Sequence, residues 1–149
     1  MRIEVFTEGD VCLPYEGLEK GVVMRIARKV CRLLELNDVS LALILTDNRT
    51  IRKLNREYRG KDRSTDVISF AYRDEPFPDT GGREEMLGDI YISLVKTLSQ
   101  AGKYGVSFRE EFCRLLIHGV LHLIGYDHEL SAEEEERMRT KEAELMASL

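Results

Sequence analysis

The chain contains three histidines, and all of them fall within eleven consecutive residues: His118, His122 and His128. Residues four apart on a helix lie on the same face, so the imidazoles of His118 and His122 can reach one ion together. Three imidazoles leave a coordination position open, which is typical of catalytic rather than structural metal sites. The spacing therefore predicts a three-histidine metal centre.

The third histidine reaches this centre only if the chain reverses after the helical pair. Gly125 stands between His122 and His128, and glycine readily adopts the left-handed conformation that ends a helix. Imidazole ligands suit zinc, but also nickel, copper and iron. We expect one divalent ion, with Zn²⁺ as the first choice and Ni²⁺ as an alternative.

A divalent ion with an open position favours hydrolysis, and two classes of hydrolase compete. The histidine spacing is that of the zinc-protease motif H-E-x-x-H-x-x-G-x-x-H, but Gly119 occupies the position of the glutamate that serves as general base. Asp89, Asp127 or Glu129 could substitute for it in space. A zinc metallopeptidase therefore stays open as an alternative.

The charge of the chain is unevenly distributed. Its net charge is -5, yet residues 49–63 hold seven basic and two acidic residues, a local charge of +5 that leaves -10 for the remainder. Such a basic stripe can hold a polyanion while the acidic body repels it. A solvated helix face explains the same pattern, so charge alone leaves both interpretations open.

Length and composition are those of a globular protein. The 149 residues, 43% hydrophobic and 33% charged, suit one domain, residues 1–149. The amino terminus lacks the pattern of a signal peptide, and no segment has the length of a membrane span, so we expect a cytoplasmic location. Cys12, Cys31 and Cys113 are odd in number and far apart, which argues against disulfides.

The elements that must position the histidines follow from hydrophobic periodicity. Strand composition marks residues 2–6, 40–45, 66–72 and 87–93, the first being an edge or near-edge strand. Helical spacing marks residues 18–36, 46–58, 94–104, 107–124 and 131 onwards. Loose alternation of strands and helices predicts an α/β or α+β layered domain with a small mixed sheet and about five helices.

Local signals place the ends of several elements. Ser107 with Glu110, and Ser131 with Glu134, form capping-box patterns at the starts of the last two helices. The histidine pair then lies near the end of a core helix. Two prolines, two glycines and several acids in residues 73–86 predict a mobile, hairpin-like excursion.

Three separated blocks of the sequence are LNREYRGKDRSTDVISF (54–70), LGDI (87–90) and HGVLHLIGYDH (118–128). In composition and order they closely resemble the YbeY family of bacterial endoribonucleases. The resemblance implies a metal-dependent RNase directed at single strands, which acts in ribosomal RNA maturation, notably of the 16S 3′ end, and in ribosome quality control. It also implies ribosomal partners. The family commonly has proline where this chain has Ser64 and Ala71.

Carried over by motif, the resemblance implies that His118, His122 and His128 hold the ion and that Arg59 is the catalytic arginine. A guanidinium near the metal would stabilise the charge that develops on a phosphodiester. The alternative for Arg59 is an ordinary ion pair with Asp62 or a neighbour. The basic residues expected to guide the RNA backbone are Lys53, Arg56, Lys61 and Arg63.

Two further expectations concern the surroundings of the histidines. Asp127 either holds an imidazole proton of His128 or caps the region before the last helix. Gly119 leaves room above the metal for a phosphate. A third class of function also stays open, a metal-stabilised, ribosome-associated factor without catalysis, which would lose stability but no activity when the metal is removed.

Overall fold

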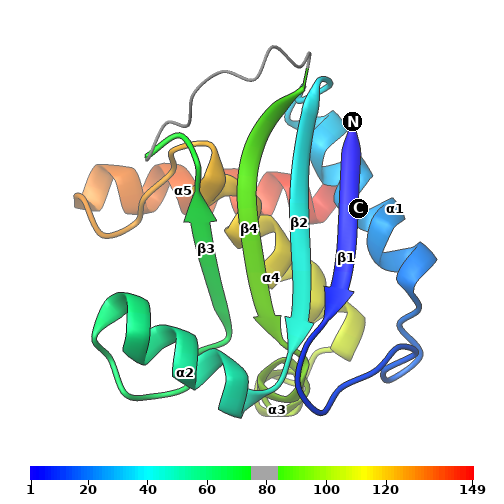
Figure 1. Cartoon of the computed structure of the whole chain (residues 1–149). Coiled ribbons are helices and arrows are strands. Elements are labelled where there is room, and N and C mark those ends of the chain that lie inside the picture. Colours follow the sequence, from blue (N-terminus) through cyan, green and yellow to red (C-terminus); the bar gives the residue numbers. More distant parts are fainter. Residues whose placement is uncertain (75–83) are drawn as a thin grey trace.

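A four-stranded mixed sheet forms the centre of the protein (Figure 1). The computed structural model describes residues 1–74 and 84–149. The strands are β1 (Arg2–Thr7), β2 (Val39–Thr46), β3 (Val67–Ala71) and β4 (Glu85–Ser93), in the order β1-β2-β4-β3. β1 and β4 both run parallel to β2, whereas β3 runs antiparallel to β4. The mixed sheet and the edge position of β1 are confirmed.

Five helices surround the described part of the sheet: α1 (Lys20–Leu33), α2 (Asn48–Arg59), α3 (Leu94–Tyr104), α4 (Phe108–Leu123) and α5 (Ala132–Ser148). Figure 1 shows α1, α4 and α5 on one face of the sheet, and α2 beside the start of β3. The predicted layered α/β fold is therefore confirmed. Within residues 1–74 and 84–149, no helix combines the length and apolar character needed to cross a membrane.

The hydrophobic core lies between the sheet and the helices on that face. Its buried residues include Leu43 and Ile92 from the strands and Val30, Phe112 and Leu116 from α1 and α4, each with no exposed surface. Burying a side chain of this size stabilises the fold by about 1.5–3 kcal/mol. α4 has ten buried residues in its sixteen and is thus the central helix of the core.

The predicted helix starts are confirmed by their capping bonds. The Asp47, Ser107 and Ser131 side chains accept hydrogen bonds from the backbone N–H groups of Thr50, Glu110 and Glu134, at 2.8, 3.1 and 3.1 Å. Each bond satisfies a donor that the first helical turn leaves unpaired. On either side of the predicted excursion, β3 and β4 pair antiparallel; residues 75–83 lie outside the described residues.

The last turns of α4 approach the sheet closely at Gly119. A Cβ at this position would lie 2.7 Å from Cγ2 of Ile90, a residue of β4 with no exposed surface. The Ser69 hydroxyl of β3 donates to the Gly119 carbonyl at 3.3 Å. The expectation that Gly119 makes room for a phosphate is therefore wrong, because the missing side chain would meet the sheet rather than a ligand. This glycine permits helix packing.

Gly119→Ala should lower the free energy of unfolding by about 1–3 kcal/mol, because the added methyl overpacks a rigid, buried contact. Gly102→Ala is the matched control: it lies within α3, and a Cβ there would meet nothing within 4 Å. That change should raise the free energy of unfolding by about 0.5–1 kcal/mol through helix propensity. Urea unfolding measures both, and equal stability of the two variants would contradict the packing argument.

Candidate metal centre and its cleft

The three histidines converge at the C-terminal end of α4. The Nε2 atoms of His118 and His122, one helical turn apart, are separated by 3.1 Å. One nitrogen from each of His118, His122 and His128 lies within 4.8 Å of the others. The ring centroids of His118 and His122 are 4.6 Å apart, and each of them is 5.4 Å from that of His128. The predicted convergence is confirmed.

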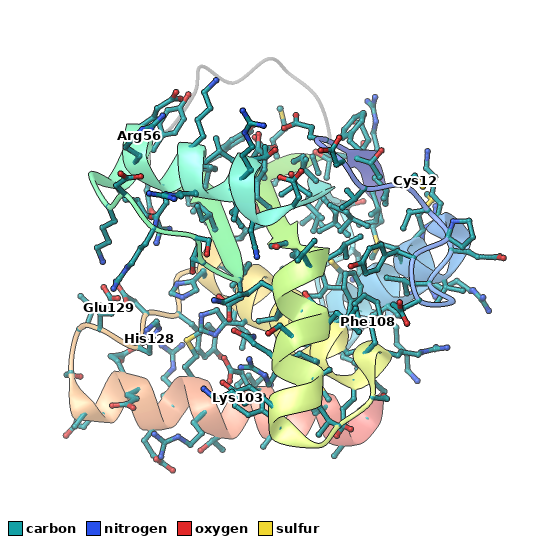
Figure 2. All side chains as sticks on the ribbon, turned by 90° about the horizontal axis from the view of Figure 1, so that it is seen from below. Cys12, Arg56, Lys103, Phe108, His128 and Glu129 are labelled. Carbon is teal, nitrogen blue, oxygen red and sulfur yellow. The ribbon has the colours of Figure 1, made fainter. Side chains whose placement is uncertain are left out.

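His128 joins the helical pair because the chain reverses at Gly125, whose φ is 103°. The Tyr126 N–H donates to the Leu121 carbonyl at 3.0 Å, and the Gly125 N–H donates to the His122 carbonyl at 3.2 Å. These two bonds form the Schellman motif, which ends a helix with a left-handed residue. Figure 2 shows His128 in the loop between α4 and α5, facing the space between α2 and α5.

The nitrogen atoms suit a divalent cation. In a tetrahedral site with metal–nitrogen distances of about 2.0–2.1 Å, neighbouring ligand nitrogens lie about 3.3 Å apart. The Nε2 atoms of His118 and His122 are separated by nearly this distance, 3.1 Å. At this distance one ring can donate an N–H···N hydrogen bond to the other, and a cation bound by both nitrogens would take the place of that proton. The side chain of His128 is 42% exposed, so the cluster opens towards solvent on its side.

His122 is held neutral by its surroundings. Burial is the largest cause that lowers the pKa of this imidazole to about 4, and the neighbouring His118 and His128 contribute to the same value. The guanidinium of Arg59 acts in the same direction, while Asp127 opposes it. At pH 7 His122 is therefore neutral, which is the charge state that metal binding requires.

A cleft of about 520 Å³ is lined by the three histidines together with basic and acidic side chains. The acidic ones are those of Asp66, Asp74, Asp127 and Glu129. The basic side chains that line the cleft are those of Arg59, the last residue of α2, and of Lys61 and Arg63 in the loop that follows. A terminal nitrogen of Arg59 lies 3.5 Å from the Ser69 carbonyl oxygen. Arg59 thus faces the same cleft as the histidines, although 59 positions separate it from His118 in the chain.

The expected alternative for Arg59, an ion pair with Asp62, is not formed. The Asp62 carboxylate accepts a hydrogen bond from Arg52 Nε at 2.9 Å and lies 3.9 Å from Arg56. The hydrogen bond from Arg52 holds the pKa of Asp62 below its usual range. Among the residues that the structure describes, no carboxylate lies within ion-pair distance of Arg59. Its charge is therefore available to the cleft.

The predicted basic stripe divides between two surfaces of α2 and its loop. Lys61 and Arg63 line the histidine cleft, whereas Lys53 and Arg56 line a separate depression on the outside of α2. Figure 2 shows Arg56 on the side of α2 away from His128. Helical periodicity could not separate the cleft residues from the outer ones, because the helix ends at Gly60 and Lys61 and Arg63 lie in the loop beyond it.

The loop that carries Lys61 and Arg63 is held by Asn55, a residue that sequence reasoning missed. Asn55 is 3% exposed, and its side-chain amide donates to the Arg63 carbonyl at 2.9 Å. The Lys61 N–H donates to the Asn55 carbonyl at 3.2 Å. The sequence did contain a signal for Asn55: it is a polar residue on the same helix face as the apolar Ile51. A buried amide needs hydrogen-bond partners, so such a position indicates a structural contact.

The carboxylates near the site differ from those expected. Asp127 Oδ1 accepts from the Glu129 N–H at 2.9 Å, so this aspartate stabilises the loop after α4. Asp89 accepts from the Tyr72 hydroxyl at 3.0 Å. Glu129 Oε1 lies 3.8 Å from His128 Nε2, whereas Glu142 of α5 is within hydrogen-bond distance of an imidazole, with its Oε1 2.7 Å from His118 Nδ1. Sequence reasoning missed Glu142, because it lies on another helix, 24 positions after His118.

Fold and site together define a class: an α/β protein with a three-histidine cluster that suits a metal ion, in a cleft that also holds Arg59, Lys61 and Arg63. Residues 15–149 match the family model described as endoribonuclease YbeY. The chain belongs to the YbeY endoribonuclease family.

Relatives named endoribonuclease YbeY support this membership. The Sulfurihydrogenibium protein is 45% identical over 117 residues, which are 78% of this chain and 74% of the relative. The Persephonella marina protein is 40% identical over 133 residues, 89% of this chain and 85% of the relative. The solution structure of a Thermotoga maritima protein superposes with a TM-score of 0.63 at 27% identity, over 97% of this chain and 86% of that one.

The lowered pKa of His122 predicts a pH dependence in chelator-treated protein. A histidine with a pKa near 6.5 when unfolded and about 4 when folded stabilises the fold fully above pH 6.5. This contribution is lost as the pH falls from 6.5 towards 4. NMR titration of the His122 ring should show a neutral imidazole at pH 5.5. A transition of that ring near pH 6.5 would contradict the prediction.

Proposed function

We propose that the protein is a metal-dependent endoribonuclease that hydrolyses phosphodiester bonds of single-stranded RNA. The observation that carries the proposal is the joint placement of the three histidines and Arg59 in one cleft. Membership of the YbeY endoribonuclease family supports the reaction class. In this proposal His118, His122 and His128 hold one divalent ion, with Zn²⁺ as the first choice and Ni²⁺ as an alternative.

Each part of the site has a distinct role in this proposal. The bound ion would supply Lewis-acid polarisation of a phosphoryl oxygen and a more acidic water. Arg59 donates hydrogen bonds to the phosphodiester oxygens, whose negative charge grows during attack. Because no acidic side chain neutralises Arg59 among the described residues, its full charge acts on the transition state. The exposed side of His128 lets a long strand approach.

The loop after α2 supplies contacts to the RNA backbone. Lys61 and Arg63 line the cleft and would bind phosphates on either side of the scissile bond, without reading bases. The cations on the outside of α2, including Lys53 and Arg56, would bind the strand further away. Cations that follow a backbone without reading bases suit a single strand.

We place this activity in ribosomal RNA maturation, notably at the 16S 3′ end, and in ribosome quality control, with a cytoplasmic location and ribosomal partners. The family resemblance supports this placement. The net charge of -5 would repel the bulk of a folded RNA from the protein surface outside the cleft. A strand end that extends away from such a body can still enter the cleft.

Cleavage of single-stranded ribosomal RNA fragments by metal-loaded protein tests the proposal. His118→Ala and chelation should abolish cleavage, and Arg59→Ala should slow it by about 10²-fold because one oxyanion-stabilising group is lost. Arg59→Lys should recover only part of the rate, because lysine lacks the bidentate geometry.

Two outcomes would overturn the proposal. Equal residual cleavage in all samples indicates a contaminant and favours the non-catalytic ribosome-associated factor. Cleavage of peptides that survives Arg59→Ala favours the metallopeptidase alternative.

A second experiment tests the RNA path. Lys61→Gln should weaken binding to all single-stranded sequences alike and reduce the slope of log K against log salt by about 0.7, because one phosphate contact is lost. Lys103→Gln is the control, since Lys103 lies at the end of α3 and does not line the cleft (Figure 2). Fluorescence anisotropy at several salt concentrations measures both slopes, and identical slopes would remove Lys61 from the path.

A further inference from the structure

α5 brings a carboxylate to the back of the histidine cluster. Glu142 Oε1 lies 2.7 Å from Nδ1 of His118, while Nε2 of the same ring faces His122 Nε2 at 3.1 Å. The side chains of His118 and Glu142 are 23% and 21% exposed, so their contact is largely shielded from water. His118 therefore has one nitrogen on a carboxylate and the other in the cluster.

The contact depends on how α5 docks against the rest of the protein. Met138 and Leu145 are the buried residues of α5, at 1% and 3% exposure. Glu142 lies four residues after the first and three before the second, so all three share one helix face. Packing of this apolar face fixes the carboxylate at His118. The most acidic part of α5, its first turns, takes no part in the contact.

An ion pair with one buried partner lies one turn away on α4. Arg114 donates through Nε and a terminal nitrogen to the two carboxylate oxygens of Glu111, at 2.7 and 2.8 Å. Glu111 is 2% exposed and also accepts from the Gln100 amide at 2.7 Å. The hydrogen bonds to Glu111 raise the pKa of Arg114, and the charge of Glu142 adds to this. The guanidinium of Arg114 is thus held in place on the helix that carries His118.

We propose that Glu142 is a positioning residue of the metal centre, which accepts the Nδ1–H of His118 and so presents Nε2 to the ion. The inference rests on the proposed role of the histidines as ligands. A carboxylate only accepts hydrogen bonds, so the proton of a neutral His118 must sit on Nδ1. Without this contact the ring can rotate or adopt the other tautomer, in which Nε2 carries the proton and cannot bind metal.

Metal affinity tests the role directly. Glu142→Gln and Glu142→Ala should bind Zn²⁺ alone about 10–100-fold more weakly than the unaltered protein, measured by competition with a chromophoric chelator at one fixed pH. Glu144→Gln is the matched control: it lies on the same helix, its side chain is 64% exposed, and it pairs with Lys141 at 3.6 Å. This control should bind Zn²⁺ as tightly as the unaltered protein.

A second readout separates positioning from a purely structural role. Nitrogen-15 NMR of the imidazoles in chelator-treated protein should show His118 protonated at Nδ1, and a mixture of tautomers in Glu142→Gln. A merely structural glutamate would alter urea unfolding without moving the tautomer. The near-isosteric Glu142→Gln keeps the test valid if Glu142→Ala does not fold.

Unchanged Zn²⁺ affinity in Glu142→Gln, or Nε2 protonation of His118 in the unaltered protein, would overturn the inference. Failure of the nuclease proposal would look different: no RNA cleavage by metal-loaded protein, with the difference in Zn²⁺ affinity between Glu142→Gln and Glu144→Gln intact. The two proposals can therefore fail independently.

Discussion

The close packing of α4 on the sheet is the contact on which the rest of the site depends. Gly119 lies between the two helical histidines and brings the helix backbone against Ile90 of β4 and Ser69 of β3. With the helix held at this point, His118 and His122 line the same cleft as Ser69 of β3. Arg59, at the end of α2, lies 3.5 Å from the Ser69 carbonyl and lines this cleft too. The contact of α4 with β3 thus brings the histidines to the strand that Arg59 also reaches.

Electrostatics then decide what the cleft can bind. Asp62 pairs with Arg52 and lies close to Arg56, so its carboxylate does not pair with Arg59. The cations that line the cleft are Arg59, Lys61 and Arg63, and they share it with four carboxylates, those of Asp66, Asp74, Asp127 and Glu129. The lining is therefore mixed in charge. A divalent ion held by the histidines would add positive charge where a polyanionic substrate would react.

Hydrogen bonds to buried or half-buried polar groups hold this arrangement in place. Asn55 ties the loop that carries Lys61 to α2, and Glu142 ties α5 to the ring of His118. In the described residues, no buried side-chain nitrogen or oxygen lacks a hydrogen-bond partner. Since an unpaired buried polar group costs about 1–3 kcal/mol, each of these contacts constrains the elements it joins. The candidate metal centre is therefore supported from helices on two sides.

The sequence by itself determined the local features, because they depend on residues within one or two helical turns. The spacing of His118 and His122, the left-handed Gly125 and the serine caps all follow from helix geometry. The resemblance to the family's sequence blocks added Arg59 to the predicted site. Only the tertiary structure decided that Glu142 meets His118 across 24 positions, that Gly119 serves packing, and that Lys61 and Lys53 belong to different surfaces. These outcomes depend on which apolar faces pack together, and local periodicity shows that a face exists without specifying its partner.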